Sequence, residues 1–201
     1  KNIIKFCKYN NVKKIFFLSS SAVYSKKNSL TFDENKKINP NNSLGISKFK
    51  SEKILKSFLA KTSIKVIILR VFTVYGTNMR KGQFLYQAIK KFKSKNKKIV
   101  FWNKNIYRNF IHVDDLIHII IKLTKINTPK YAIYNIGSNR PYKIETVINY
   151  LNKISGKKRE IIYKNNENNL SHKVNISKIK NKIKLSFKDF KKELIKLYEG
   201  I

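Results

Sequence analysis

The sequence predicts an α/β protein built around a partial doubly wound parallel sheet. Strand and helix patterns alternate along its 201 residues and are separated by short polar segments, an order typical of doubly wound sheets. Two strand segments, Lys14 to Ser19 and Lys65 to Leu69, have continuously apolar centres, as expected for strands that are buried on both faces of a parallel sheet. With 42% hydrophobic and 12% aromatic residues, the chain can form a sizeable core.

The first half of the chain contains two helix and strand pairs. Apolar residues at helical spacing predict a helix from Asn2 to Tyr9, ahead of the strand Lys14 to Ser19. A polar loop from Ser25 to Ser43 leads to a helix from about Leu44 to Lys61, which precedes the strand Lys65 to Leu69. Each helix can therefore return the chain to the start of a parallel strand.

The second half continues this alternation. The expected elements are a helix from Gln83 to Lys93, strands at Ile99 to Trp102 and Phe110 to Val113, a helix from Asp114 to Thr124, a strand at Tyr131 to Ile136, a helix from Ile144 to Ile154, a strand at Glu160 to Tyr163 and a helix from Phe187 to Tyr198. Asp114 is the expected N-cap of its helix, because a short acidic side chain can accept the free backbone N–H groups there.

Composition excludes several classes of protein. The formal charge of +34 comes from lysines spread along every segment together with many Asn and Ile residues, which is what AT-rich coding DNA produces, so no specific nucleic-acid site is expected. Apolar residues never run for the roughly 18 positions that a membrane span needs, and the first residues lack the apolar core of a signal peptide. A single cysteine, Cys7, excludes an internal disulfide. A cytoplasmic location is therefore expected.

Polar clusters follow three of the expected strands, at 19–21, 73–76 and 137–138. Ligands of a doubly wound sheet bind at the carboxyl ends of its strands, so these clusters are expected to meet in one crevice. The three histidines, His112, His118 and His172, do not have the spacing of metal ligands, and no metal site is expected.

Two motifs carry a resemblance to a known family. One is Ser-Ser-Ser-Ala-Val-Tyr at 19–24, and the other is Asn-Pro at 39–40 followed by Ser-Leu-Gly-Ile-Ser-Lys at 43–48 and by Glu52. They resemble the active-site strand end and the Pro-x-x-x-Tyr-Gly-x-Ser-Lys-x-x-x-Glu helix of the extended short-chain dehydrogenase/reductases, the NAD-dependent sugar-nucleotide epimerases and dehydratases. The resemblance extends from residue 11 to about residue 176.

The resemblance implies roles for the residues of these two motifs. In the family, a tyrosine and a lysine four residues apart share a helix face, where the ammonium lowers the phenol pKa and holds the nicotinamide ribose. Lys48 matches the lysine, but Leu44 stands at the tyrosine position and cannot transfer a proton. Ser20 matches the hydroxyl that bonds the reacting sugar carbon, with a turn-capping serine as the alternative. Ser19 falls on the cofactor side, and Tyr24 is structural in the family.

Two more motifs imply cofactor and substrate contacts. Leu-Arg-Val-Phe-Thr-Val-Tyr-Gly at 69–76, with Arg80 beyond it, is similar to the family segment that runs past the nicotinamide toward the substrate. Phe72 and Thr73 are then expected at the cofactor, and Thr73 and Arg80 at the sugar or its phosphate.

The other motif, Tyr-Arg-Asn-Phe-Ile-His-Val-Asp-Asp-Leu at 107–116, is similar to the family's Arg-Asp-Phe-Ile-x-Val-x-Asp. Arg108 suits a diphosphate, because a guanidinium donates two parallel charge-assisted bonds; a surface salt bridge is the alternative. Phe101 is expected under the nucleotide base, or else in ordinary core.

The match fades toward the end of the chain. Tyr-Asn-Ile-Gly-Ser at 134–138 resembles a late strand end of the family, but no second phosphate-binding arginine precedes Val-Asn-Ile-Ser-Lys at 174–178. With only six glycines, the chain also lacks the glycine-rich turn that binds a dinucleotide. On this resemblance the first half of the cofactor domain is absent, and either the chain is a fragment or its partner half lies on another polypeptide.

The resemblance implies a Rossmann-like sheet with a smaller C-terminal α/β lobe. Residues 1–76 and 114–138 are assigned to the NAD-binding domain, and residues 77–113 and 139–201 to the substrate lobe. The implied activity is NAD-dependent epimerisation or dehydration of a nucleoside-diphosphate sugar for polysaccharide or lipopolysaccharide precursors. NAD, or alternatively NADP, is expected to bind only when the missing half is supplied, and a homodimer is compatible with the family. A non-catalytic sugar-nucleotide-binding or scaffolding relative is the alternative.

Overall fold

The computed structural model describes residues 2–24, 31–165, 171 and 173–201. Its helices are α1 (Asn2–Tyr9), α2 (Ser43–Phe58), α3 (Phe84–Lys93), α4 (Val113–Lys125), α5 (Ile144–Ser155), α6 (Ser177–Lys180) and α7 (Phe190–Gly200), with 3₁₀ turns η1 (Ser21–Val23) and η2 (Leu59–Lys61). Its strands are β1 (Lys14–Ser20), β2 (Thr31–Phe32), β3 (Lys65–Val71), β4 (Thr73–Tyr75), β5 (Lys98–Trp102), β6 (Tyr107–His112), β7 (Tyr131–Ile136), β8 (Pro141–Lys143), β9 (Glu160–Lys164) and β10 (Lys173–Val174).

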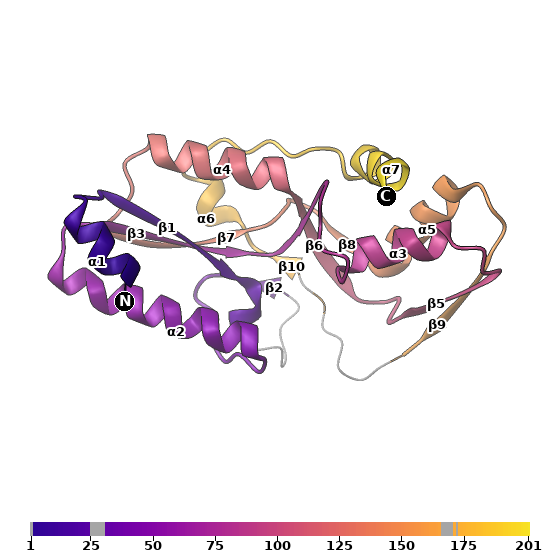
Figure 1. Cartoon of the computed structure of the whole chain (residues 1–201), viewed down its shortest axis with the longest axis horizontal. Coiled ribbons are helices and arrows are strands. Elements are labelled where there is room, and N and C mark those ends of the chain that lie inside the picture. Colours follow the sequence, from indigo (N-terminus) through magenta and orange to yellow (C-terminus); the bar gives the residue numbers. More distant parts are fainter. Residues whose placement is uncertain (1, 25–30, 166–170, 172) are drawn as a thin grey trace.

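The main sheet is parallel and has the order β1-β3-β7. Helices α1 and α2 lie on one face, and α4 and α6 lie on the other (Figure 1). Alternate residues of β3 serve the two faces: Val66 and Ile68 pack with Leu55 of α2, whereas Ile67 and Leu69 pack with the α4 side. The continuously apolar strand is thus explained by burial on both faces, and the predicted doubly wound α/β fold is confirmed.

The elements that form a second hydrophobic cluster lie toward the other end of the molecule (Figure 1). It is formed by α3, α5 and α7 together with β5 and the aromatic residues Tyr75 and Phe110. Two small sheets border it, β4-β6-β8 and the parallel pair β5-β9. Although α6 lies between α5 and α7 in sequence, Ile176, Ile179 and Ile183 pack with the main sheet. The division of these regions into a cofactor domain and a substrate lobe stays a prediction.

Local differences from the sequence prediction concern short elements, one helix cap and two element starts, because β6 begins three residues earlier than predicted and α7 three residues later. Strands β2, β4, β8 and β10 and helix α6, each two to four residues long, were not predicted. The prediction of Asp114 as N-cap is wrong. The helix begins one residue earlier and its cap is His112, whose Nδ1 accepts the Asp114 N–H at 3.2 Å. Part of the predicted 25–43 loop lies outside the described residues.

Strand β1 forms one edge of the main sheet. Among the described strands it pairs with β3 alone. Leu18, near its end, is 45% exposed, whereas every residue of β3 after Lys65 is buried. An edge strand presents unpaired backbone groups that can accept a further strand, so the sheet can be extended at β1.

Candidate functional site

The end of β1 turns directly into η1, where Ser20 is the cap. Its Oγ accepts the Ala22 N–H at 3.1 Å. This is the turn-capping bond that the sequence left as an alternative. It uses the oxygen as an acceptor, so the hydroxyl hydrogen can still be donated to a ligand. The structure therefore shows the local role of Ser20, and its contact with a sugar stays a prediction.

Helix α2 begins against this same turn. Asn42 caps the helix by accepting the Gly45 N–H at 2.8 Å. A Cβ at residue 45 would overlap the carbonyl of Ala22 and the side chain of Pro40, so glycine is required for the first turn of α2 to approach η1 this closely. The close approach carries the following residues of α2 to the end of β1.

Lys48 and Leu44 have different surroundings on this helix. The Lys48 ammonium donates to the carbonyl of Leu18 at 2.8 Å and lies 5.1 Å from the ring centre of Phe17. The structure thus places Lys48 at the end of β1. Leu44 is 50% exposed, so the apolar side chain at the family's tyrosine position faces outward and is not required for the core.

Ser19 is directed into the protein. Its buried hydroxyl donates to Glu52 Oε1 at 2.5 Å, and Glu52 is paired with Arg70 at 2.8 Å. The sequence reasoning gave neither Glu52 nor Arg70 a role of its own. The scarcity of arginine in a lysine-rich chain was a signal that could have identified Arg70. A contact of Ser19 with the cofactor stays a prediction.

Tyr24 is also fully buried. Its hydroxyl donates to Asn135 Oδ1 at 2.6 Å and accepts from Arg70 Nη1 at 3.1 Å. Burial raises the pKa of Tyr24 to about 12. A buried phenol whose oxygen is already bonded to Asn135 and Arg70 is a poor general base, so the geometry favours a structural role for Tyr24.

The remaining residues predicted on the cofactor and substrate sides are spread over a wider area. Phe72 is buried with Val23, Tyr24 and Phe32. Thr73 is half-buried in β4, opposite Phe110 of β6. Arg80 is exposed before α3, beside Gly82 and Gln83. It does not line the cavity that holds Arg108.

That cavity is about 150 Å³ in volume and brings together Phe101 and Arg108. Phe84 lies on its wall, with its ring centre 5.8 Å from the Arg108 guanidinium carbon. The Nε of Arg108 is buried and has no hydrogen-bond partner among the described residues. Burial lowers the pKa of Arg108, but a guanidinium remains charged at neutral pH. The cavity therefore presents a half-buried guanidinium with an unpaired Nε over the ring of Phe84, a setting that suits an anion attached to a flat base.

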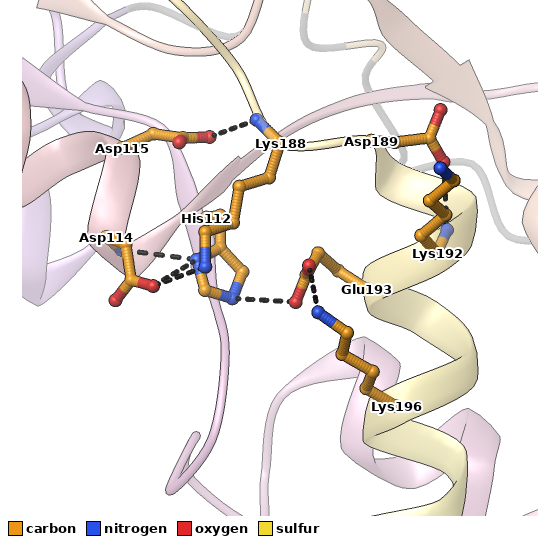
Figure 2. Close-up of polar contacts among 8 residues, drawn as sticks. All are labelled: His112, Asp114, Asp115, Lys188, Asp189, Lys192, Glu193 and Lys196. Atoms are coloured by element: carbon orange, nitrogen blue, oxygen red, sulfur yellow. Dashed lines mark hydrogen bonds and ion pairs between the residues drawn. The ribbon is translucent and has the colours of Figure 1, made fainter.

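His112 belongs to a polar cluster between the start of α4 and α7 (Figure 2). His112 caps α4, and its ring also approaches Glu193 of α7, where His112 Nε2 and Glu193 Oε2 are 3.6 Å apart. Lys188 bonds both acidic residues of α4, donating its N–H to Asp115 at 3.1 Å and its Nζ to Asp114 at 2.5 Å. Within the described part of the chain, no three His, Cys, Asp or Glu side chains could hold a metal. His172 lies outside the described residues.

Comparison with known proteins adds to this geometry. A family model described as the NAD dependent epimerase/dehydratase family matches residues 1–137. The chain belongs to this family. The match includes the end of β1, all of α2 and Arg108. Among the helices that the structure describes, none is long and apolar enough to cross a membrane.

Individual relatives agree with the family. A putative UDP-glucose 4-epimerase of Methanocaldococcus jannaschii is 31% identical over 81% of this chain and 53% of its own length. The structure resembles UDP-N-acetylglucosamine 4-epimerase from Methanobrevibacter ruminantium with a TM-score of 0.87 and 20% identity, over 98% of this chain and 66% of that one. The structure also resembles UDP-glucuronic acid 4-epimerase from Bacillus cereus in complex with NAD. The TM-score is 0.85 and the sequence identity 24%, over 98% of this chain and 62% of that one. The chain spans about half the length of the curated relatives it matches.

Proposed function

We propose that this chain forms the sugar-nucleotide side, and part of the NAD side, of an epimerase or dehydratase that acts on a nucleoside-diphosphate sugar. The observation that carries the proposal is the buried, unpaired Nε of Arg108 in a cavity walled by Phe84 and Phe101. A cation without a partner is costly to bury, so this arrangement is best explained by an anionic ligand. A nucleoside diphosphate fits this cavity, because its phosphates can pair with the guanidinium and its base can pack against the aromatic side chains. Nucleoside-diphosphate sugars are precursors of polysaccharides and lipopolysaccharides.

The end of β1 supplies the residues for the chemistry. When bound, NAD supplies the hydride acceptor that this family requires. We propose that Lys48 holds the ribose beside the reacting sugar, in exchange for its bond to Leu18, and that Ser20 donates its hydroxyl hydrogen to the sugar oxygen. The position of both residues at the end of β1 supports these roles. Leu44 offers no proton, so with this residue the proton transfer must be slow.

NAD, or alternatively NADP, fits only part of this chain. Lys48, with Phe72 and Thr73, would hold the nicotinamide side, but a glycine-rich turn for the pyrophosphate does not occur in the sequence. The open edge of β1 and the exposed Leu18 give a second polypeptide segment a place to extend the sheet. We therefore propose a partner half at β1, in a cytoplasmic protein that can form a homodimer.

Calorimetric titration of the chain with UDP-, GDP- and dTDP-sugars tests the proposal. We expect one nucleotide class to bind, and replacement of Arg108 by Ala to weaken it. NAD alone should bind very poorly to residues 1–201, because most of its contacts are missing. Equal binding of every sugar nucleotide by the native and Arg108→Ala forms would contradict the substrate assignment, and micromolar NAD affinity would contradict the need for a partner half.

A second candidate is a non-catalytic sugar-nucleotide-binding module, which the exposed Leu44 favours. The two candidates differ in the effect of Leu44→Tyr in the chain joined to a complete cofactor half. If the chain is part of an enzyme, the phenol introduced by Leu44→Tyr should raise turnover by the roughly 100- to 10,000-fold that a positioned general acid/base contributes. Turnover is followed as NAD reduction and epimerised product. Rapid turnover with Leu44 that the substitution does not improve would show that another group is the base.

A further inference from the structure

A buried ion pair joins α2 to the middle strand of the main sheet. Arg70, near the carboxyl end of β3, donates from Nη2 to Glu52 Oε2 at 2.8 Å and from Nε to Oε1 at 3.2 Å. Both residues are 3% exposed. Glu52 Oε1 also accepts from Ser19 of β1. The carboxylate of α2 is thus bonded to two adjacent strands.

The same guanidinium extends the network toward the third strand. Its Nη1 donates to the Tyr24 hydroxyl at 3.1 Å and to the Glu34 carbonyl at 3.3 Å. Tyr24 in turn bonds Asn135 of β7, whose N–H donates to Glu34 Oε1 at 2.8 Å. All three strands of the main sheet therefore contribute a side chain to one network near their carboxyl ends, where Lys48 also lies.

Stability alone does not account for such a pair. Removing two charges from water costs about as much as their attraction returns, and apolar replacements of similar size are often as stable. A guanidinium fork paired with a carboxylate does, however, require one distance and one orientation. The pair is therefore well suited to fix where α2 sits on the sheet.

Residues 44, 48 and 52 are four apart along α2 and lie on one helix face. Because Glu52 is held in one position on the sheet, the orientation of this helix face relative to the sheet is also held. We propose that Arg70 and Glu52 are positioning residues, which hold α2 on the ends of β1 and β3 so that Lys48 reaches the Leu18 carbonyl and the exposed position 44 lies next to Lys48 on the helix. The proposal rests on the proposed function for the use of this face, but the geometry itself can be measured without NAD or sugar.

The test uses Leu44→Tyr as a probe of position. In protein labelled with ¹³C at tyrosine Cζ, the new resonance reports the titration of the phenol introduced at position 44. With α2 in place, the Lys48 ammonium should move the titration midpoint below the ordinary tyrosine value by about one pH unit or more. In the Glu52→Gln, Arg70→Met background, which removes both charges together, α2 no longer holds the Lys48 ammonium at the Leu18 carbonyl. The flexible lysine then spends less time beside the phenol, so the midpoint should rise toward the ordinary value while the protein stays folded.

Matched variants separate position from general damage. Glu160→Gln removes a carboxylate from the exposed Lys98–Glu160 pair and should leave the midpoint of the introduced phenol low. Arg70→Lys keeps the positive charge but loses the two parallel hydrogen bonds of the guanidinium, so it should raise the titration midpoint of the phenol part of the way. If the double variant does not fold, Arg70→Lys still tests whether this pair positions α2. An unchanged midpoint in a folded Arg70→Lys or double variant would overturn the proposal. So would an ordinary midpoint in the Leu44→Tyr protein itself.

This result is independent of the proposed function. Arg108 lies in a separate cavity, so sugar-nucleotide binding can be measured on the same variants. Loss of binding in the Arg108→Ala form bears on the substrate, whereas the titration of the phenol introduced by Leu44→Tyr bears only on the position of α2.

Discussion

Two arginines of this chain, the buried Arg70 and the half-buried Arg108, have opposite surroundings. Arg70 makes two hydrogen bonds to Glu52 and further bonds to Tyr24 and the Glu34 carbonyl. Burial alone would lower its pKa, but the bonds to Glu52 and the charge around it raise the pKa above the ordinary value. Arg108 has an unpaired Nε among the described residues, and burial lowers its pKa.

The comparison shows that partners, more than residue type, indicate what a buried arginine does. The charge of Arg70 is already compensated inside the protein, so its interactions act on the protein's own structure. Arg108 retains hydrogen-bonding capacity in a cavity, so its interactions are available to a ligand. Loss of Arg70 should therefore affect folding and the position of α2, while loss of Arg108 should affect binding.

The largest expected effect is that of Arg70→Met on stability. The substitution leaves Glu52 charged, buried and without its main partner, which typically costs about 3–5 kcal/mol in the free energy of unfolding. Urea unfolding followed by circular dichroism measures it. The double variant Glu52→Gln, Arg70→Met leaves no uncompensated charge and should recover most of the loss. If the single and double variants were equally destabilised, the charge pairing would not be the cause.

The next effect is that of Arg108 on affinity. Arg108→Ala should weaken sugar-nucleotide binding by about 1.5–3 kcal/mol, the range for a charge-assisted hydrogen bond. Arg140→Ala is the matched control, because Arg140 is exposed and lies outside the cavity. Arg108→Met should not lower the free energy of unfolding of the unliganded chain, since it removes a half-buried guanidinium whose buried Nε has no partner among the described residues. A stability loss as large as that of Arg70→Met would show that the two arginines are equivalent after all.

Much of the fold was predictable because it depends on local pattern. The continuous apolar runs of β1 and β3 and the helical spacing of α1 and α3 gave elements whose bounds agree with the structure to within about two residues. The short pair β2 and β10 was not predictable in this way. Each has two residues, and Thr31 is aligned with Lys173, so the pairing exists only once distant parts of the chain have folded.

The site shows the same division. The motifs placed Ser20 and Lys48 at the end of β1 and grouped Phe101 with Arg108, because these positions follow from the resemblance to the family. The resemblance alone does not reveal hydrogen bonds. It left the Glu52–Arg70 pair without a role, and it did not show that His112 caps α4, since an imidazole is not among the usual helix caps.

The smallest expected effect sharpens the comparison with an exposed ion pair. Lys188 and Asp114 form one at the start of α4 (Figure 2), and the hydrogen bond from Lys188 lowers the pKa of Asp114 from the ordinary 3.8. A carboxyl whose pKa is lower in the folded state stabilises the protein above its unfolded pKa. That contribution is lost as the pH falls through the lower, folded value.

Asp114→Asn should therefore lower the melting temperature slightly at pH 6 and have progressively less effect below about pH 4, where the native Asp114 becomes protonated as well. Thermal melts at several pH values measure this difference, and Glu160→Gln controls for the loss of one negative charge from a strongly cationic chain. Because water and salt screen an exposed pair, the difference at pH 6 should also shrink with added salt. Arg70→Met should keep its effect in salt, since the Glu52–Arg70 pair is buried. If salt reduced the two effects equally, burial would not distinguish these ion pairs, and the special role given to Arg70 would lose its physical basis.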